Sequence, residues 1–399
     1  MSVVEMPNML GDLWAPMPSE WLSEPPPPRE WLLVKTSDHA EDMGVLPRGV
    51  VGLLASAGGV GKTMLVSQLA LLVGAGCGRP FIGEIVVAAP ARGGRVLLAL
   101  GEEDAAEIRR RVFNAALALR LTPEQRDRAL GNVVVLPLRG RDCALVGTDP
   151  ASRTTYRTQL HADLLERLKA EGPWALVILD PMARFSGADA ESSNALATQF
   201  VSAAEALCAV PGSPALLIAH HTSQVARNTG DRSAVAARGV TGLVDGVRWV
   251  ATLTTEEESS GMVVCLAVAK TNYSPPIPES FHAKRSREFS GALVPLTDDD
   301  EATLEEARRA NDRDTKREQK KAARVTLEDE KILAALPEPP GSLTLGGLLA
   351  ALAGDGLGLS EKTLRNRLDG LADRGYARDL SGGSRGTKRA WARTGGERV

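Results

Sequence analysis

The sequence predicts an α/β protein in which helices flank a mostly parallel sheet, and three observations support this fold class. Short β-prone runs alternate with helical segments from residue 49 to about residue 296. One of these runs enters a glycine-rich turn that opens directly into a helix. Hydrophobic residues make up 43% and charged residues 24% of the 399 residues, which is typical of a globular chain with a large core.

The elements of this alternation follow from their residue types and spacing. Strands are expected at residues 50–55, 95–100, 132–136, 175–179, 215–219, 246–254 and 262–269, where β-branched and apolar residues form short runs. Helices are expected at residues 64–73, 106–118, 156–170 and 194–208, where apolar residues recur at helical spacing. Such an order predicts a doubly wound sheet.

The glycine-rich turn after the first strand has the composition of a phosphate-binding loop. Glycine lets backbone N–H groups approach phosphate closely, and the following helix presents its positive end to the same anion. Lys62 is expected to bridge the β- and γ-phosphates of ATP, and the Thr63 hydroxyl to bind Mg²⁺. Ser56 departs from the usual pattern, which begins with glycine. The expected nucleotide-binding residues are Gly58, Gly59, Val60, Gly61, Lys62, Thr63 and Met64.

Two further strands deliver carboxylates to the same edge of the sheet. Asp180 follows the apolar run 175–179, and it is the expected second ligand of Mg²⁺ beside Thr63. Glu102 and Glu103 follow the run 95–100. Hydrolysis needs a group that orients or deprotonates water, and this second strand supplies candidates for it.

Charge and cysteine content narrow the class of protein. The net charge of −3 excludes a uniformly basic coat that binds nucleic acid, although local basic surfaces stay open. Cys77, Cys143, Cys208 and Cys265 are isolated and lack metal-ligand spacing, so we interpret them as reduced core thiols. No targeting segment or membrane span is apparent, and a cytoplasmic location is expected.

The chain divides into four expected parts. Residues 1–45 contain four consecutive prolines and three tryptophans, Trp14, Trp21 and Trp31, which favours an extended arm that docks on the core or on a neighbouring subunit. Residues 46–297 form the nucleotide-binding domain. Residues 298–326 are a charged linker or helix. Residues 327–399 form a small separate domain.

The C-terminal segment has the order of a winged-helix domain, with three short helices followed by a two-stranded wing. Residues 361–399 contain ten Lys or Arg and five Asp or Glu, which gives a surplus of 10 − 5 = +5 positive charges. A surplus of this kind on a recognition helix and wing is expected of a duplex DNA binder. Winged helices also serve as protein–protein modules, and that alternative stays open.

Several motifs together resemble one family. They are the Glu-Asp step at residues 103–104, the sequence Leu-Asp-Pro-Met-Ala-Arg-Phe at 179–185, the pair His-His-Thr-Ser at 220–223, Arg-Gly at 238–239 and Asp-Gly-Val-Arg-Trp at 245–249. This set resembles the RepA-type plasmid replicative helicases, which are ring-forming ATPases of the RecA-like class. The resemblance covers roughly residues 29–275 and implies a RecA-like P-loop NTPase domain.

The resemblance implies roles for particular residues. Glu103 would be the catalytic carboxylate, with Glu102 as the neighbour that could take its place. His220 would sense the γ-phosphate, and Arg248, with Arg238 second, would reach the nucleotide of a neighbouring subunit. Lys270-Thr271-Asn272 has Asn where the related interface motif commonly has Arg. The alternatives to these functional roles are structural. His220 could be a hydrogen-bonded core residue, and Arg238 and Arg248 could form ion pairs within the chain.

The expected function is therefore an ATP- and Mg²⁺-dependent DNA helicase or translocase of a plasmid or other mobile element. It would form a homo-oligomer, a hexamer, that passes single-stranded DNA through its channel past residues 222–237, while the winged helix binds duplex DNA. This channel segment has two arginines and no aromatic residue. A DNA-binding ATPase regulator or loading factor without unwinding activity is the alternative, and a small-molecule kinase is a third.

Overall fold

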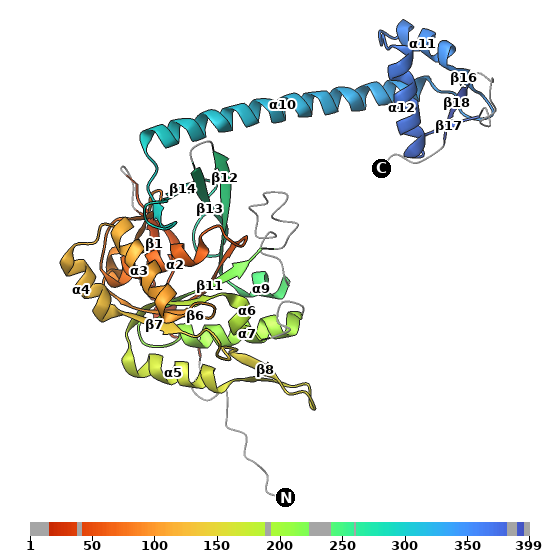
Figure 1. Cartoon of the computed structure of the whole chain (residues 1–399). Helices are drawn as coiled ribbons and strands as arrows, with labels where there is room; N and C mark the ends of the chain where they lie inside the picture. Colours follow the sequence, from red (N-terminus) through yellow and green to blue (C-terminus); the bar gives the residue numbers. More distant parts are fainter. Residues whose placement is uncertain are drawn as a thin grey trace, which may run out of the picture. The chain divides into compact units, whose positions relative to one another are not determined.

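A computed structural model describes residues 16–37, 42–187, 193–222, 241–258, 261–380 and 389–394 of the chain. The chain divides into two compact units, Met1–Thr297 and Asp298–Val399 (Figure 1). Among the described residues, no helix combines the length and the apolar character needed to cross a membrane.

A nine-stranded sheet with the order β15-β14-β13-β12-β3-β11-β10-β6-β7 forms the centre of the first unit (Figure 1). The six strands from β12 to β7 run parallel, and β13, β14 and β15 extend the sheet in antiparallel fashion. The bounds are β3 Val51–Ser56, β6 Arg95–Leu100, β7 Val133–Pro137, β10 Trp174–Asp180, β11 Ala215–His221, β12 Trp249–Glu258, β13 Gly261–Thr271, β14 Ser280–Arg285 and β15 Leu293–Val294. The predicted α/β class with a mostly parallel sheet is confirmed.

Helices cover both faces of this sheet because its strands are apolar on both faces. Leu176 and Ile178 of β10 pack in one core, whereas Val177 and Leu179 pack in the other. The first core is shared with α2 Lys62–Gly74, α3 Ala105–Ala118 and α4 Pro123–Asn132. The second is shared with α5 Gln159–Glu171, α6 Met182–Phe185, α7 Asn194–Cys208 and α9 Thr241–Gly246.

The N-terminal segment differs from the extended arm that the proline run predicted. After the short helix α1 Glu20–Ser23, the chain enters a second sheet with the order β2-β1-β5-β4. Its strands are β1 Trp31–Lys35, β2 Met43–Pro47, β4 Pro80–Ile82 and β5 Ile85–Val87, and a 3-10 turn, η2 Ala89–Ala91, follows. Leu32 and Leu33 lie in the main core. The prediction of an arm up to residue 45 is therefore wrong for β1 and β2, because their apolar residues are buried against the domain.

Other boundaries shift for local reasons. The helix expected to begin at residue 156 begins at Gln159, because the Thr158 side chain accepts a hydrogen bond from the His161 N–H and caps it. Residues 155–157 instead form β9 Thr155–Arg157, which pairs with β8 Val146–Thr148. The strand expected from residue 246 begins at Trp249, after α9.

The second unit begins with one long helix, α10 Asp298–Ala335, which continues past the expected boundary at residue 326. It is followed by α11 Leu345–Gly354, α12 Glu361–Asp373 and a sheet of β16 Leu343–Thr344, β18 Ala390–Arg393 and β17 Ala377–Asp379. The end of α10 packs into the small core of this unit through Ile332, and Leu336, directly after the helix, joins the same core. Residues 298–326 and the first helix expected after them are therefore parts of one element.

Candidate active site

A pocket of about 500 Å³ lies at the carboxyl ends of the parallel strands. Its lining comes from the phosphate loop, from the segment after β6, from the ends of β10 and β11, from α3, and from the turn between β14 and β15. Elements distant in sequence therefore meet at one site.

The phosphate loop has the predicted strand–turn–helix form. Gly59 and Gly61 have φ values of 82° and 113°, which favour glycine. Lys62 begins α2 and is buried, and its Nζ donates to the His220 carbonyl at 3.0 Å. Thr63 and Met64 also line the pocket. The positive end of α2 and an ammonium group thus face the same space, as anion binding requires.

Ser56 can replace the usual first glycine because its backbone is that of a strand. It is the last residue of β3, is paired with His221 and Leu253, and is not among the residues with positive φ. Its hydroxyl donates to the Ala57 carbonyl at 3.0 Å. The departure from the motif therefore causes no backbone strain.

Asp180 and Thr63 form an oxygen pair at the floor of the pocket. The Asp180 carboxylate accepts a hydrogen bond from the Thr63 hydroxyl, and Asp180 is only 2% exposed. Burial raises the pKa of Asp180, while Thr63 and Lys62 oppose that rise. Its Oδ2 is buried and has no hydrogen-bond partner within the described part of the chain. A hydroxyl and an unsatisfied carboxylate oxygen beside a phosphate loop fit Mg²⁺, which prefers oxygen ligands.

Glu103 lies beside this pair because Gly101 connects the ends of two strands. The Gly101 N–H donates to the Asp180 carbonyl at 2.8 Å. This bond places the segment that comes after β6 alongside the end of β10. Burial raises the pKa of Glu103. The Arg111 guanidinium, whose Nη2 lies 3.2 Å from Glu103 Oε1, lowers this pKa, whereas the negative charges of Asp180 and Glu102 raise it further. A carboxylate with a raised pKa accepts protons more readily. Glu102 lines the same pocket and is more exposed.

Of the two histidines that end β11, His221 is the one at the pocket. Its Nδ1 lies 3.4 Å from Lys62 Nζ, and the residue is exposed and lines the pocket. His220 is 3% exposed and contributes its carbonyl group to Lys62, while its side chain is absent from the pocket lining. Adjacent strand residues point to opposite faces, so one of the pair is turned away. The placement favours His221 over the predicted His220.

Arg285 is a pocket residue that the sequence did not indicate. Its Nη1 donates to the Gly59 carbonyl at 2.8 Å, and it lines the pocket with Ser290 and Gly291. The side-chain amide of Gln68 in α2 exchanges two hydrogen bonds of 2.8 Å with the backbone of Leu293. The strands β14 and β15 are thereby attached to the helix that follows the phosphate loop.

Residues 12–227 match the model of a protein family described as an AAA domain. The match spans 227 − 12 + 1 = 216 of the 399 residues, which is more than half of the chain. The chain belongs to this family. Together with the phosphate loop and its carboxylates, this membership identifies an ATPase. The matched region of the AAA domain begins before residue 46, in agreement with the folded strand β1.

Three solved structures are similar to this AAA-domain protein in fold. One, described as an ATPase domain, is 13% identical and covers 63% of this chain and 86% of its own, with a TM-score of 0.43. A DnaB-like replicative helicase is 14% identical over 63% of this chain and 58% of its own, with a TM-score of 0.42. The KaiC-like protein PH0186 from Pyrococcus horikoshii OT3 is 14% identical over 68% of this chain and 100% of its own, with a TM-score of 0.40. At these identities the similarity is one of fold.

Arg248 lies far from the pocket of its own AAA domain. It precedes β12, is exposed, and its N–H donates to the carbonyl of Val51, the first residue of β3. The phosphate loop follows the other end of β3. Arg248 is therefore separated from the nucleotide pocket of its own chain by the length of a strand.

The neighbouring Lys270 has a local role in the AAA domain. Its Nζ donates to the carbonyls of Val244 at 2.7 Å and Val247 at 2.9 Å, at the end of α9. These bonds satisfy carbonyls that a helix end leaves unpaired. The other predicted interface residue, Arg238, lies in residues 223–240, outside the described residues.

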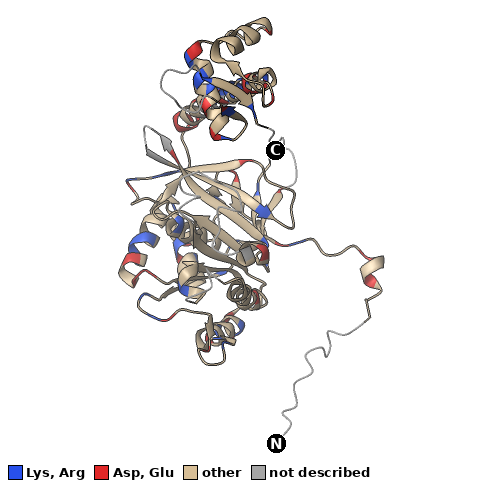
Figure 2. Cartoon of the chain, turned by 90° about the vertical axis from the view of Figure 1, so that its right-hand side faces the viewer, with Lys and Arg blue, Asp and Glu red and all other residues tan. Residues whose placement is uncertain are grey.

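Several arginines of the second unit are paired with acids. Arg367 lies 2.7 Å from Glu328 and 3.1 Å from Asp329, and Arg374 lies 2.8 Å from Asp329. Both signs of charge are interspersed on this unit (Figure 2). Over residues 327–399 the balance is eleven basic against ten acidic residues, or 11 − 10 = +1. The five acidic residues between 327 and 360 thus offset most of the surplus of +5 that was counted from residue 361.

We expect Asp180→Asn to stabilise the protein without nucleotide and to weaken its response to Mg²⁺ and ATP. Because burial raises the pKa of Asp180, its ionised form costs the folded state free energy at neutral pH, and Asn removes a cost on the order of 1–2 kcal/mol. The gain should shrink as pH falls and the wild-type carboxyl becomes protonated. Urea unfolding across pH, with and without Mg²⁺ and a non-hydrolysable ATP analogue, measures both effects. The exposed Asp127→Asn is the control, and a loss of stability in nucleotide-free Asp180→Asn would contradict the assignment.

The two histidines should respond differently to substitution by alanine. His221→Ala is expected to lower turnover by about 10²-fold with nucleotide binding retained, because His221 lies at the pocket. His220→Ala should mainly lower stability, because it removes a buried side chain. Steady-state ATP hydrolysis, nucleotide titration and thermal unfolding separate the two effects. Equal turnover in His221→Ala and wild type would exclude His221.

Proposed function

We propose that this chain is an ATP-hydrolysing, ring-forming DNA translocase of the RepA helicase type, in which each nucleotide lies between two subunits. The observation that carries this proposal is the separation of Arg248 from the pocket of its own chain. An exposed arginine opposite the phosphate loop can complete a pocket only in a neighbouring copy. A closed ring of head-to-tail contacts lets every copy both give and receive such a residue.

The chemistry follows from the pocket residues. Backbone N–H groups of the phosphate loop and the Lys62 ammonium bind the phosphates of ATP. Mg²⁺ held by Thr63 and Asp180 would neutralise phosphate charge when bound. Glu103 accepts a proton from the attacking water, and the fixed charge of the neighbour's Arg248 stabilises the charge that develops on the transferred phosphate. His221, beside Lys62, reports the presence of the terminal phosphate to the segment that follows β11.

Single-stranded DNA is the proposed polymer in the channel, and a homohexamer is the proposed assembly. The segment 222–237, with Arg227 and Arg232, would face the channel and move with the nucleotide state. The C-terminal unit would act as a winged helix that binds duplex DNA or loads the ring. Replication of a plasmid or another mobile element is the process that this assembly would serve.

The test combines hydrolysis, assembly and unwinding on the full chain. We expect a six-subunit particle by light scattering, ATP hydrolysis that rises with single-stranded DNA, and unwinding of a forked duplex that requires ATP. Lys62→Ala, which removes the phosphate-binding ammonium, is the control without nucleotide binding. A monomer whose hydrolysis ignores DNA would contradict the ring translocase.

A second candidate is an ATPase regulator or loading factor that binds DNA but does not unwind it. The ion pairs of Arg367 and Arg374 favour this candidate, because paired arginines leave the C-terminal unit with little surplus charge for duplex DNA. Such a protein would assemble and hydrolyse ATP, yet the forked duplex would stay paired. The unwinding assay thus distinguishes the two functions.

A further inference from the structure

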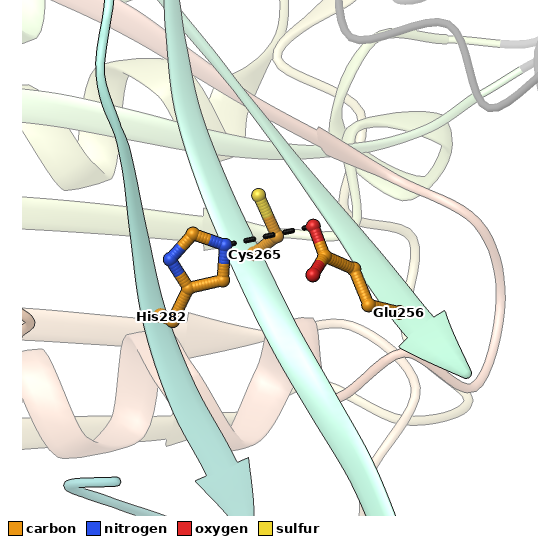
Figure 3. Close-up of side chains that lie close together, drawn as sticks. All are labelled: Glu256, Cys265 and His282. Carbon is orange, nitrogen blue, oxygen red and sulfur yellow. Dashed lines mark ion pairs between the residues drawn. The ribbon is translucent and has the colours of Figure 1, made fainter. Parts of the chain in front are cut away.

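Three potential metal ligands meet on neighbouring antiparallel strands away from the nucleotide pocket. Cys265 of β13 is paired directly with His282 of β14 and with Thr254 of β12. Glu256 lies two residues after Thr254, and residues two apart in a strand point to the same face. The sheet register therefore brings the Glu256, Cys265 and His282 side chains together, as Figure 3 shows.

The distances among these groups are close to those of a metal centre. Their ligand atoms all lie within 4.8 Å of one another, and His282 Nε2 lies 3.6 Å from Glu256 Oε1. In a tetrahedral zinc site, bond lengths of about 2.0–2.3 Å place ligand atoms about 3.3–3.6 Å apart. Metal binding would require side-chain rotations that bring the three ligand atoms to this spacing.

The burial of the three groups suits a site that opens to solvent on one side. Cys265 is fully buried, and the side chains of His282 and Glu256 are 9% and 18% exposed. Thr254 is the direct cross-strand neighbour of Cys265, and its hydroxyl can hydrogen-bond a water molecule that acts as a fourth ligand. A site with three protein ligands and one water is a common form of zinc coordination.

We propose that Glu256, Cys265 and His282 bind a divalent transition-metal ion, with Zn²⁺ as the preferred ion. A thiolate, an imidazole and a carboxylate are all zinc ligands, whereas Mg²⁺ requires oxygen ligands. Binding converts the Cys265 thiol to a thiolate and releases its proton to solvent. The ion joins β12, β13 and β14, and β14 ends at Arg285, which contacts the phosphate loop. The inference does not depend on the proposed function.

The ordinary alternative is an ion pair between His282 and Glu256 that binds no metal ion. Such a pair involves two of the three groups and needs no thiolate. A cobalt probe separates the alternatives, because a thiolate bound to Co²⁺ produces a charge-transfer absorption that carboxylate and imidazole ligands do not. Thiolate coordination is thus the property to measure.

The experiment titrates the metal-free full chain, without an affinity tag, with Co²⁺ and then Zn²⁺ in excess Mg²⁺, which occupies oxygen-only sites. We expect one Co²⁺ per chain with the thiolate absorption, and its displacement by Zn²⁺. Cys265→Ser should remove the absorption, and Glu256→Gln and His282→Gln should each weaken Co²⁺ affinity at least about 10-fold. Thermal unfolding should shift upward with Zn²⁺ in wild type and far less in the variants.

Cys208→Ser is the matched control, since Cys208 is a buried free thiol on α7. It should keep both the absorption and the affinity. Should Cys265→Ser fail to fold, the Glu256→Gln and His282→Gln affinities decide the question. An absence of thiolate absorption in folded wild type, or wild-type affinity in both of these variants, would overturn the site.

Discussion

Glu103→Gln should bind ATP and hydrolyse it about 10²–10³-fold more slowly than wild type. Glutamine keeps the size of the side chain and removes its capacity to accept a proton. The environment prepares Glu103 for that step, because burial raises its pKa while Arg111, 3.2 Å away, keeps it oriented. Single-turnover hydrolysis together with equilibrium nucleotide binding measures the two effects separately.

Glu102→Gln is the matched control, since Glu102 lines the same pocket from the adjacent position. It should retain turnover within a few fold of wild type. A reversal, with slow Glu102→Gln and near-normal Glu103→Gln, would assign the step to Glu102. The pH dependence adds a further check: turnover of wild type should fall as pH drops through the raised pKa of Glu103, whose protonated form accepts no proton.

Arg248→Ala should bind nucleotide normally and lose about 10³-fold in turnover, because arginines that act across an interface commonly contribute that much. The residue is exposed and cannot reach its own pocket from the far end of β3. Arg126→Ala, an exposed arginine on α4, is the control and should behave as wild type. Hydrolysis at saturating ATP and binding of a fluorescent nucleotide provide the measurements.

Mixing two inactive variants tests the assignment between subunits. Arg248→Ala chains supply an intact phosphate loop, and Lys62→Ala chains supply an intact Arg248. When the two exchange at random in a ring, about one junction in four joins an intact loop to an intact arginine, so activity should return in the mixture. Arg248 has no role in trans if the mixed particles stay as inactive as either variant alone.

Local pattern was sufficient to predict much of the fold. The bounds of β6 and α7 agree with the predicted ranges 95–100 and 194–208, because apolar runs and the Ser193 cap are encoded in adjacent residues. The phosphate loop and its two carboxylate-bearing strands were likewise evident. By contrast, β14 and β15 are short, and Arg285 reaches the loop only through sheet pairing over more than two hundred residues.

The site was harder to predict where a choice depended on orientation or on distant partners. The His220–His221 pair marks the end of β11 clearly, yet only the facing of the strand decides which imidazole reaches the pocket. The positive charge of α12 seemed free because Glu328 and Asp329 lie more than thirty residues earlier in the chain. Cys265 lacks metal-ligand spacing along the sequence, since its neighbours come from two other strands.

The position of β3 in the middle of the large sheet has a mechanical consequence. The strand has six residues with a rise of about 3.3 Å per residue, so its first and last Cα atoms lie about 17 Å apart. The phosphate loop follows one end, and the Arg248 N–H donates to the carbonyl at the other. Hydrogen bonds to β11 and β12 on either side prevent it from stretching or bending independently. A displacement of the phosphate loop would therefore move the opposite end of β3, where Arg248 is bonded, as one body with the strand. In the proposed ring, hydrolysis at neighbouring pockets should then be cooperative, with the turnover rate rising sigmoidally with ATP concentration.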